Sequence, residues 1–171
     1  MDAAWQDGSS VMSPLQWAFL PIEKYANFSG RAPRSEYWWF YLFQMLLGLI
    51  TTVIDSLLEL DGPGSPLSTN LIVGLGLFLP SLAVTVRRFH DINRSGWSVL
   101  TTFVPIFVVL FLLLLTPIGW ALLVFGGWIA GILLALVIIW VVIKFIGFMV
   151  TEGNPGDNLY GPDPYGRQYG Y

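Results

Sequence analysis

The 171-residue chain contains no cysteine and a single histidine. The lack of cysteine excludes disulfides, thiolate nucleophiles, iron–sulfur clusters and thiolate zinc sites, which all need that side chain. One histidine excludes a multi-histidine metal site within one chain. The sequence also lacks a Gly-x-Ser-x-Gly elbow and a phosphate-binding glycine loop. It offers no catalytic set, so we expect neither an enzyme nor a protein that needs a cofactor.

Charge is scarce as well. Asp, Glu, Lys and Arg make up 11% of the chain, whereas hydrophobic residues make up 55%. So few charges would not cover the apolar surface of a soluble domain of this length. The apolar stretches are continuous runs rather than alternating strands, which indicates membrane-spanning helices and not an outer-membrane barrel. The basic residues are not arranged as a nucleic-acid footprint, and no nucleic-acid partner is expected.

The apolar runs predict an all-α membrane protein, a four-helix transmembrane bundle. The spans are expected near residues 37–60, 67–86, 98–116 and 127–150, with a loop over 61–66. The last two spans come from one stretch in which Lys144 is the only charged residue. As a single helix that stretch would be roughly 80 Å long, against a hydrocarbon core of about 30 Å. The break is expected near 116–119 or near 126–127.

The chain divides into three parts: residues 1–26, a transmembrane domain over 27–150, and an irregular cytoplasmic tail over 151–171 that is rich in glycine, proline and tyrosine. In the first part, Ser13-Pro14-Leu15-Gln16 resembles an N-cap with a first-turn proline and a capping-box glutamine. It predicts a short interfacial helix over 13–26, broken at Pro21. A tail without fixed structure is the equal alternative. Ser35 is expected to cap the first span.

Basic residues lie beside only one set of span ends. Six of the eight precede the first span or separate the second from the third: Lys24, Arg31, Arg34, Arg87, Arg88 and Arg94. Lys144 is expected to reach the same surface, since it lies about 9 Å before the end of the last span. The turns over 61–66 and 117–127 contain no lysine or arginine. The positive-inside rule therefore predicts a multi-pass protein with both termini and the arginines in the cytoplasm. Asp55 and Glu59 lie near the opposite end of their span and are expected to reach water.

Residues 87–97, Arg-Arg-Phe-His-Asp-Ile-Asn-Arg-Ser-Gly-Trp, hold three arginines, one aspartate and the only histidine. Such a polar segment does not sit in hydrocarbon, so we predict a tight loop at the membrane surface. His90 and Asp91 are adjacent, and adjacent residues of a helix do not face each other. That spacing argues against a catalytic dyad.

These residues belong to a larger candidate cluster with a structural or anion-binding role: Arg31, Arg34, Arg87, Arg88, His90, Asp91 and Arg94. The favoured interpretation is a structural clamp in which Asp91, Glu36 and Asp157 pair with the arginines. One alternative is contact with anionic membrane lipid headgroups. Another is an anion site, where arginines and backbone amides near Ser95 and Gly96 hold a phosphate or a headgroup.

Two prolines suggest a different function. Pro80 and Pro105 lie at similar depth, about 10–12 Å inside the predicted cytoplasmic boundary. Matched kinks at these prolines would open a cytoplasm-facing crevice, as broken helices do in carriers, so a small transporter is the alternative. Gly74, Gly127 and Gly131 permit close helix packing, either within one chain, in a homo-oligomer or against another membrane protein.

Four sequence blocks, in this order, closely resemble the bacterial inner-membrane family filed as domain of unknown function 805. The blocks are residues 28–38 (Phe-Ser-Gly-Arg, then Arg34, Glu36, Tyr37 and Trp38), 79–84 (Leu-Pro-Ser-Leu-Ala-Val), 87–97 (Arg-Arg-Phe-His-Asp, then Arg-Ser-Gly-Trp) and 153–164 (Gly-Asn-Pro-Gly-Asp-Asn-Leu-Tyr-Gly-Pro-Asp-Pro). The resemblance implies a location in the bacterial inner membrane and no established activity. Family members usually have a shorter stretch between the last two blocks, which here is long enough for two spans.

Overall fold

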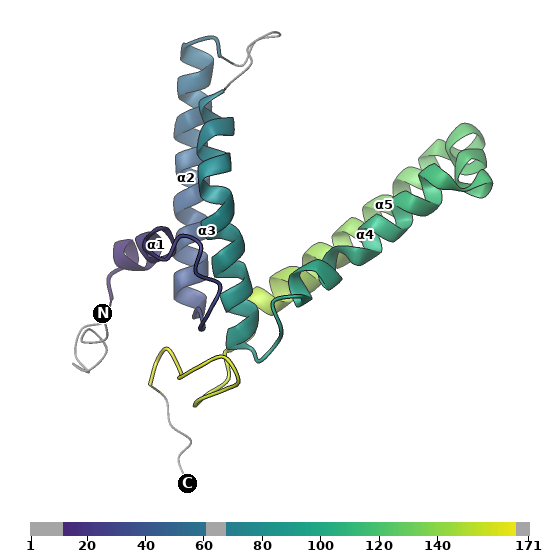
Figure 1. Ribbon diagram of the computed structural model, residues 1–171. Helices are drawn as coiled ribbons and strands as arrows, with labels where there is room; N and C mark the ends of the chain where they lie inside the picture. The colour runs from purple at the N-terminus through teal and green to yellow at the C-terminus, as the bar shows by residue number, and fades with distance from the viewer. Residues whose placement is uncertain (1–11, 61–67, 167–171) are drawn as a thin grey trace. The chain divides into compact units, whose positions relative to one another are not determined.

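The computed structural model describes residues 12–60 and 68–166, so the predicted loop over 61–66 and the start of the N-terminal tail lie outside the described residues. The described part of the chain forms helices and no strand. The helices are α1 (Pro14–Glu23), α2 (Arg34–Leu57), α3 (Thr69–Asp91), α4 (Ser98–Leu115) and α5 (Pro117–Val150) (Figure 1). Four of them contain a segment long and apolar enough to cross a membrane, the fourth being Gly126–Val150. The predicted class, an all-α membrane protein with four spans, is confirmed.

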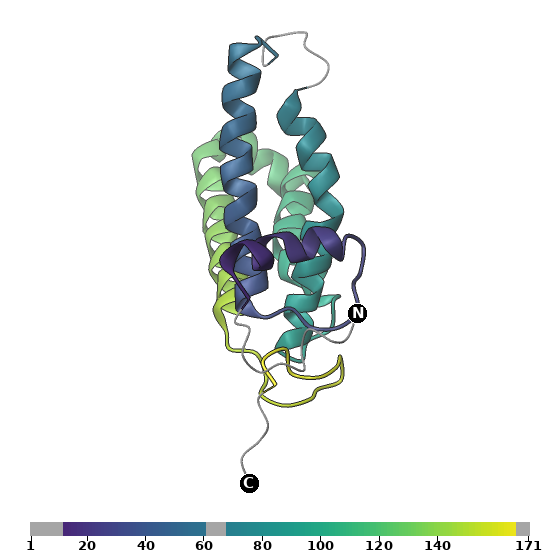
Figure 2. The same cartoon turned by 90° about the vertical axis from the view of Figure 1, so that its left-hand side faces the viewer.

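Helix α1 shows the predicted capping box. The Ser13 hydroxyl accepts a hydrogen bond from the Gln16 amide at 3.3 Å, and the Gln16 side chain accepts one from the Ser13 amide at 2.7 Å. The predicted break at Pro21 is wrong, because the helix continues to Glu23. Pro21 lacks an amide hydrogen and so removes one backbone hydrogen bond, while the residues after it remain helical. Phe19 packs against Phe43 of α2 at 5.1 Å between ring centroids, and Figure 2 shows α1 lying across α2.

Helix α2 begins three residues earlier than predicted, at Arg34. Pro33 stands outside the helix with extended backbone angles, so Ser35 lies in the first turn and is not the predicted N-cap. Glu36, also in the first turn, is buried and pairs with Lys24 at 3.7 Å. An acidic side chain here is favoured because the N-terminal end of a helix carries partial positive charge.

Two compact units make up the chain, the first formed by residues 12–28 and 32–84 and the second by 29–31 and 85–166. In the first unit, side-chain hydrogen bonds link α2 and α3. Gln44 donates to the Ser81 hydroxyl, Thr51 contacts the Asn70 side chain, and Asn70 donates to the Thr52 hydroxyl at 2.9 Å. Within a bilayer such polar contacts help hold two helices together, since lipid offers no alternative partner.

Asp55 corrects a prediction. It was expected to reach water, but its residue is 2% exposed and its carboxylate caps the start of α3. One oxygen accepts from the Thr69 amide at 2.7 Å and the other from the Asn70 amide at 3.0 Å. Glu59, by contrast, is exposed as predicted. Asp55 therefore stabilises the start of the next helix, whose first amides have no partner within the helix.

Pro80 lies inside α3, which continues through it. A proline has no amide hydrogen, so the carbonyl four residues earlier, that of Gly76, loses its helical partner. The Tyr25 hydroxyl donates to this carbonyl at 2.8 Å. The Gly76 carbonyl, which has no helical partner because of Pro80, therefore links the segment after α1 to α3 through Tyr25.

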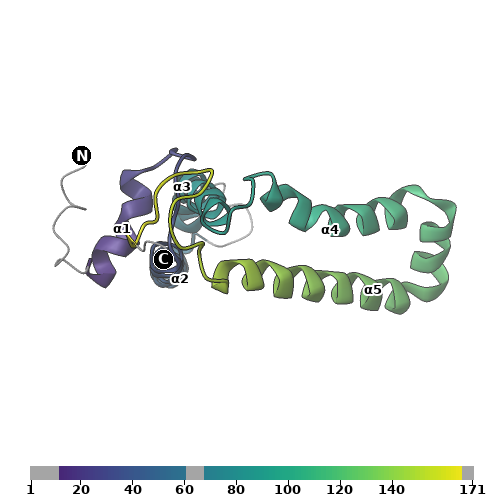
Figure 3. The same cartoon turned by 90° about the horizontal axis from the view of Figure 1, so that it is seen from below.

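In the second unit, α4 and α5 form a hairpin and run side by side (Figure 3). Both predicted break positions are used. Helix α4 ends at Leu115, and the Thr116 hydroxyl caps α5 by accepting from the Gly119 amide at 3.0 Å. Helix α5 then kinks at Gly126, whose φ of −144° and ψ of 39° are not helical. The kink lets the 34-residue helix change direction before its spanning part.

Candidate functional site: a polar cap around Asp91

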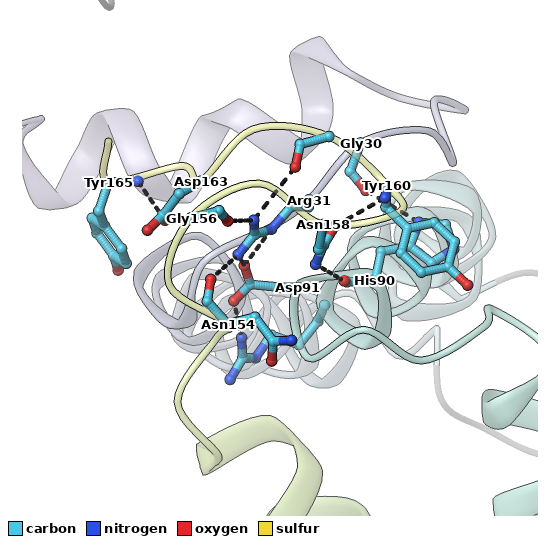
Figure 4. Close-up of polar contacts among 12 residues, drawn as sticks. Gly30, Arg31, His90, Asp91, Asn154, Gly156, Asn158, Tyr160, Asp163 and Tyr165 are labelled. Carbon is cyan, nitrogen blue, oxygen red and sulfur yellow. Dashed lines mark hydrogen bonds and ion pairs between the residues drawn. The ribbon is translucent and has the colours of Figure 1, made fainter. Parts of the chain in front are cut away.

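Three segments that are far apart in the sequence meet within the second unit. They are residues 29–31, the end of α3 with the loop that follows it (85–97), and the tail over 151–166; we call their assembly the polar cap (Figure 4). The prediction of a loop over 87–97 is wrong for its first half, since α3 continues to Asp91. Basic side chains in the last turn suit the partial negative charge of a helix C-terminus. The chain leaves the helix at Asn93, with a φ of 57°.

Arg31 is the centre of the polar cap. Its Nε donates to Asp91 Oδ1 at 3.0 Å, and its two terminal nitrogens donate to the carbonyl oxygens of Gly156 at 2.7 Å and Asn154 at 2.5 Å. A longer contact of 3.4 Å reaches the Gly161 carbonyl. The Arg31 side chain is 1% exposed. The planar guanidinium, with five donors, suits such a ring of acceptors better than a lysine ammonium would.

Arg88 occupies the other side of Asp91. Its Nη1 donates to Asp91 Oδ2 at 2.5 Å, one turn along the helix. Its Nε donates to the Met149 carbonyl at 3.2 Å, and its Nη2 donates to the Thr151 carbonyl. Carbonyls at the end of a helix have no partner within it. Arg88 therefore ties the end of α5 to the end of α3.

Asp91 is 2% exposed and engages both arginines, one with each carboxylate oxygen. Its backbone carbonyl also accepts from the Asn154 amide at 2.9 Å. A buried carboxylate needs this degree of pairing, since removing a charge from water is costly. Asp91 is the residue through which the three segments of the polar cap are joined.

His90, like Asp91, contacts the two other segments of the polar cap. Its Nδ1 lies 3.1 Å from the Gly30 carbonyl, and since a carbonyl only accepts, Nδ1 carries a proton. Its ring stacks on Tyr160 with centroids 3.9 Å apart and planes at 3°. Its own carbonyl accepts from the Asn158 side chain at 2.9 Å. The ring and the backbone of His90 both hold neighbouring segments in place.

The described part of the tail, residues 151–166, is built from turns. The Asn158 side chain accepts from the Tyr160 amide at 2.8 Å, and the Asp163 carboxylate accepts from the Tyr165 amide at 3.0 Å. Gly156 and Gly161 have φ values of 72° and 133°, which favour glycine. These turns aim the carbonyls of the tail at Arg31.

The other predicted members of the cluster differ in burial and in position. Arg87 is buried at 1% exposure and precedes the last turn of α3. Arg94 is exposed in the loop, with its guanidinium 4.6 Å from the centre of the Phe148 ring. Arg34 is exposed and, with Glu36, belongs to the first unit. Asp157 is exposed in the tail. Of the predicted arginines, the structure thus joins Arg31 and Arg88 to Asp91.

Sequence reasoning missed the main partners of the two arginines, which are backbone carbonyls of residues 149–161. Every residue has a carbonyl, so residue type does not mark an acceptor. The one available signal was the Gly-Asn-Pro-Gly composition of the tail, which indicates turns that expose carbonyls.

The polar cap also constrains the path of the chain. Arg31 precedes α2, the residues 154 and 156 follow α5, and they are hydrogen-bonded to each other. Segments in direct polar contact lie on the same side of a membrane. In a membrane, an even number of crossings would separate them, and four helices of spanning length lie between them.

Comparison with known proteins gives the family. Residues 25–162 match the family described as "Protein of unknown function (DUF805)". The chain belongs to the DUF805 family. Among similar proteins of Escherichia coli, the inner membrane protein YhaI is 35% identical over 88% of this chain and 96% of its own length. The inner membrane protein YhaH is 29% identical over 88% of this chain and 97% of its own. No solved structure matches the chain significantly.

Proposed function

We propose that this DUF805 protein is a multi-pass protein of the bacterial inner membrane whose polar cap lies in the cytoplasm, with both termini on that side. The relatives named above are inner membrane proteins. Lysines and arginines flank the helix ends near the polar cap, whereas residues 61–66 and 117–127 include none. Positive residues favour the cytoplasmic side.

The polar cap serves as a fixed binding surface rather than as a catalytic centre. The observation that carries this proposal is the capture of Arg31 by Asp91 and by the carbonyls of Asn154 and Gly156. These contacts hold the tail against the C-terminal end of α3. They also fix one conformation for a segment that has no regular secondary structure. The partners we propose are anionic lipid headgroups and a further membrane protein.

Asp91 and His90, the residues that would perform acid–base chemistry, are already engaged by internal partners, which favours binding over catalysis. Both oxygens of Asp91 are engaged by arginines, and His90 Nδ1 is engaged by the Gly30 carbonyl. Arg31 and Arg88 are buried with their donors directed at internal acceptors, which favours the clamp over an anion site at these two residues. Basic side chains that are exposed are better placed to meet a headgroup.

Single cysteines test the orientation, since the native chain has none. Ser95 and Leu159 are exposed positions of the polar cap. Ser65 belongs to the loop predicted from the sequence over 61–66, outside the described residues. An impermeant thiol reagent applied to spheroplasts should label Ser65→Cys and leave Ser95→Cys and Leu159→Cys protected until the cells are lysed. Labelling of Leu159→Cys in intact spheroplasts would overturn the cytoplasmic polar cap.

Proteolysis of inverted membrane vesicles tests the clamp. In the native chain the tail should resist cleavage, because Arg31 holds it against α3. Arg31→Ala should make the tail susceptible at a protease concentration that leaves the native chain intact. Arg34→Ala is the matched control, an exposed arginine three residues away, and should not change the cleavage rate. Equal protection in Arg31→Ala and in the native chain would refute the clamp.

A further inference from the structure

The turn after α1 (residues 24–26) reaches deep into the membrane-spanning part of the first unit. The Tyr25 hydroxyl donates to the Gly76 carbonyl of α3 at 2.8 Å. Gly76 precedes Arg87, the first charged residue of α3, by about 16 Å along the helix. Half of a hydrocarbon core is about 15 Å thick. The Tyr25 hydroxyl therefore lies near the middle of the bilayer.

Helix α1 has a second attachment inside the membrane-spanning part, on α2. Phe19 packs against Phe43 at 5.1 Å between ring centroids. Phe43 lies about 10 Å along α2 from Glu36, the last charged residue before the apolar part of that helix. Because consecutive spans cross in opposite directions, α2 begins and α3 ends on the same side of the membrane. Both attachments of the α1 segment are therefore on the inner side of the charged helix ends.

The charged residue that follows α1 limits how deep the helix can lie. Lys24 extends to the Glu36 carboxylate, in the first turn of α2, at 3.7 Å, whereas its neighbour Tyr25 extends to Gly76. A lysine at acyl depth directs its ammonium to the interface along its flexible stem. The two side chains thus reach opposite levels, and the backbone that joins them lies between these levels. Figure 2 shows α1 crossing α2 beyond the start of that helix.

Several backbone groups at the ends of α1 have partners within the protein, as a segment at acyl depth needs. At the start, the capping box engages the amides of Ser13 and Gln16, and the Trp17 amide donates to the Ser13 carbonyl at 3.1 Å. At the end, three carbonyls accept hydrogen bonds from amides of the following turn; they are those of Leu20, Ile22 and Lys24. The helix ends therefore do not depend on water.

Apolar side chains lie on both sides of α1. Trp17 and Pro21 are buried in the protein. Leu15 and Phe19, four residues apart on another face, are 71% and 44% exposed. A helix that lies on a membrane surface presents a strongly charged or polar face to water. The only charged residue of α1 is Glu23, its last, so α1 does not have such a face.

We propose that α1 and the turn after it insert among the acyl chains of one leaflet, the leaflet in which α2 begins. The exposed Leu15 and Phe19 side chains then contact the acyl chains of that leaflet, and Tyr25 fixes the depth of the segment. The insertion goes beyond the proposed function. It holds for either orientation of the chain, because the contacts that carry it lie within the first unit.

Spin labels on single cysteines measure the depth, since the native chain has no cysteine. The full-length chain is reconstituted in vesicles of phosphatidylethanolamine and phosphatidylglycerol, and collisions of the label with oxygen and with a water-soluble nickel chelate are compared. Arg34→Cys, at the exposed start of α2, marks the headgroup level. Leu46→Cys, about 15 Å along α2 from Glu36, marks the bilayer interior. The label at Leu15→Cys should lie deeper than the label at Arg34→Cys and no deeper than the label at Leu46→Cys.

A Leu15 label at the depth of the Arg34 label, or open to the nickel chelate as in water, would overturn the insertion. Tyr25→Ala removes the deepest attachment, so the Leu15 label should then shift toward the headgroups while the Leu46 label keeps its depth and shows that α2 still spans. Tyr165→Ala, at an exposed tyrosine of the tail, is the matched control and should leave the Leu15 depth unchanged. An unchanged Leu15 depth in Tyr25→Ala would overturn the role of Tyr25.

Discussion

The backbone of Gly153 packs directly against the carboxylate of Asp91, and a β-carbon at Gly153 would overlap that carboxylate. The Asp91 carboxylate cannot easily move away, because it is held between Arg31 and Arg88. Gly153→Ala must therefore displace the tail or break an arginine contact. We expect a loss of about 1–3 kcal/mol in unfolding free energy, the range for overpacking a filled site, measured by thermal unfolding in detergent.

Gly131→Ala is the control for that measurement. A β-carbon at Gly131, in the middle of α5, meets nothing within 4 Å. Alanine also favours a helix more than glycine does, by about 1 kcal/mol. Gly131→Ala should leave stability unchanged or raise it, and comparable losses in the two variants would contradict the role of Gly153.

Asp91→Ala should destabilise the protein far more than any other removal of an acidic residue in the polar cap. The substitution leaves two buried guanidinium groups without their carboxylate, and breaking a buried pair from one side costs about 3–5 kcal/mol. Denaturation in detergent, with Asp157→Ala as the exposed control in the same tail, measures the difference. Asp157→Ala should change stability by less than about 0.5 kcal/mol. Similar effects from both substitutions would show that the buried network contributes little.

Tyr25→Phe should cost about 0.5–1.5 kcal/mol, the net value of one hydrogen bond. The lost bond is the one that the Tyr25 hydroxyl donates to the Gly76 carbonyl. This carbonyl is available because Pro80 has no amide hydrogen, so Pro80→Ala should restore its helical partner. In the Pro80→Ala background, Tyr25→Phe should then cost much less. A double-mutant cycle measures this coupling, and additive effects would disprove the explanation.

Much of the fold was predictable from the sequence because it depends on local rules. Ser13 and Gln16 form the predicted capping box, and the stretch over 98–150 is divided at both of the positions considered. Hydropathy located four spans because the transfer free energy of twenty apolar residues is large and does not depend on partners. The family resemblance rested on ordered blocks of residues and is confirmed.

The interior of the candidate site was less predictable. Arg31 and Arg34 look alike in sequence, yet one is buried among carbonyls and the other is exposed. The difference depends on where residues more than 120 positions away turn their carbonyls, as the bond from Arg31 to Gly156 shows. Arg87 and Arg88 were predicted in a loop but belong to α3. Charged residues are expected at the membrane surface unless a buried partner is known, and the sequence alone does not show such a partner.

Asp55 was misjudged in the same way, and it supplies the last prediction. Its two carboxylate oxygens accept hydrogen bonds from the first amides of α3, so it acts as an N-cap from another helix. Asp55→Ala should therefore lower stability by about 1–2 kcal/mol, the usual cost of losing an N-cap. Asp55→Asn, which keeps one acceptor oxygen, should fall between that variant and the native chain. Glu59→Gln is the control, since Glu59 lies one turn further on and is exposed. The Glu59→Gln variant should be as stable as the native chain. If Asp55→Ala were also as stable as the native chain, the Asp55 carboxylate would have no capping role.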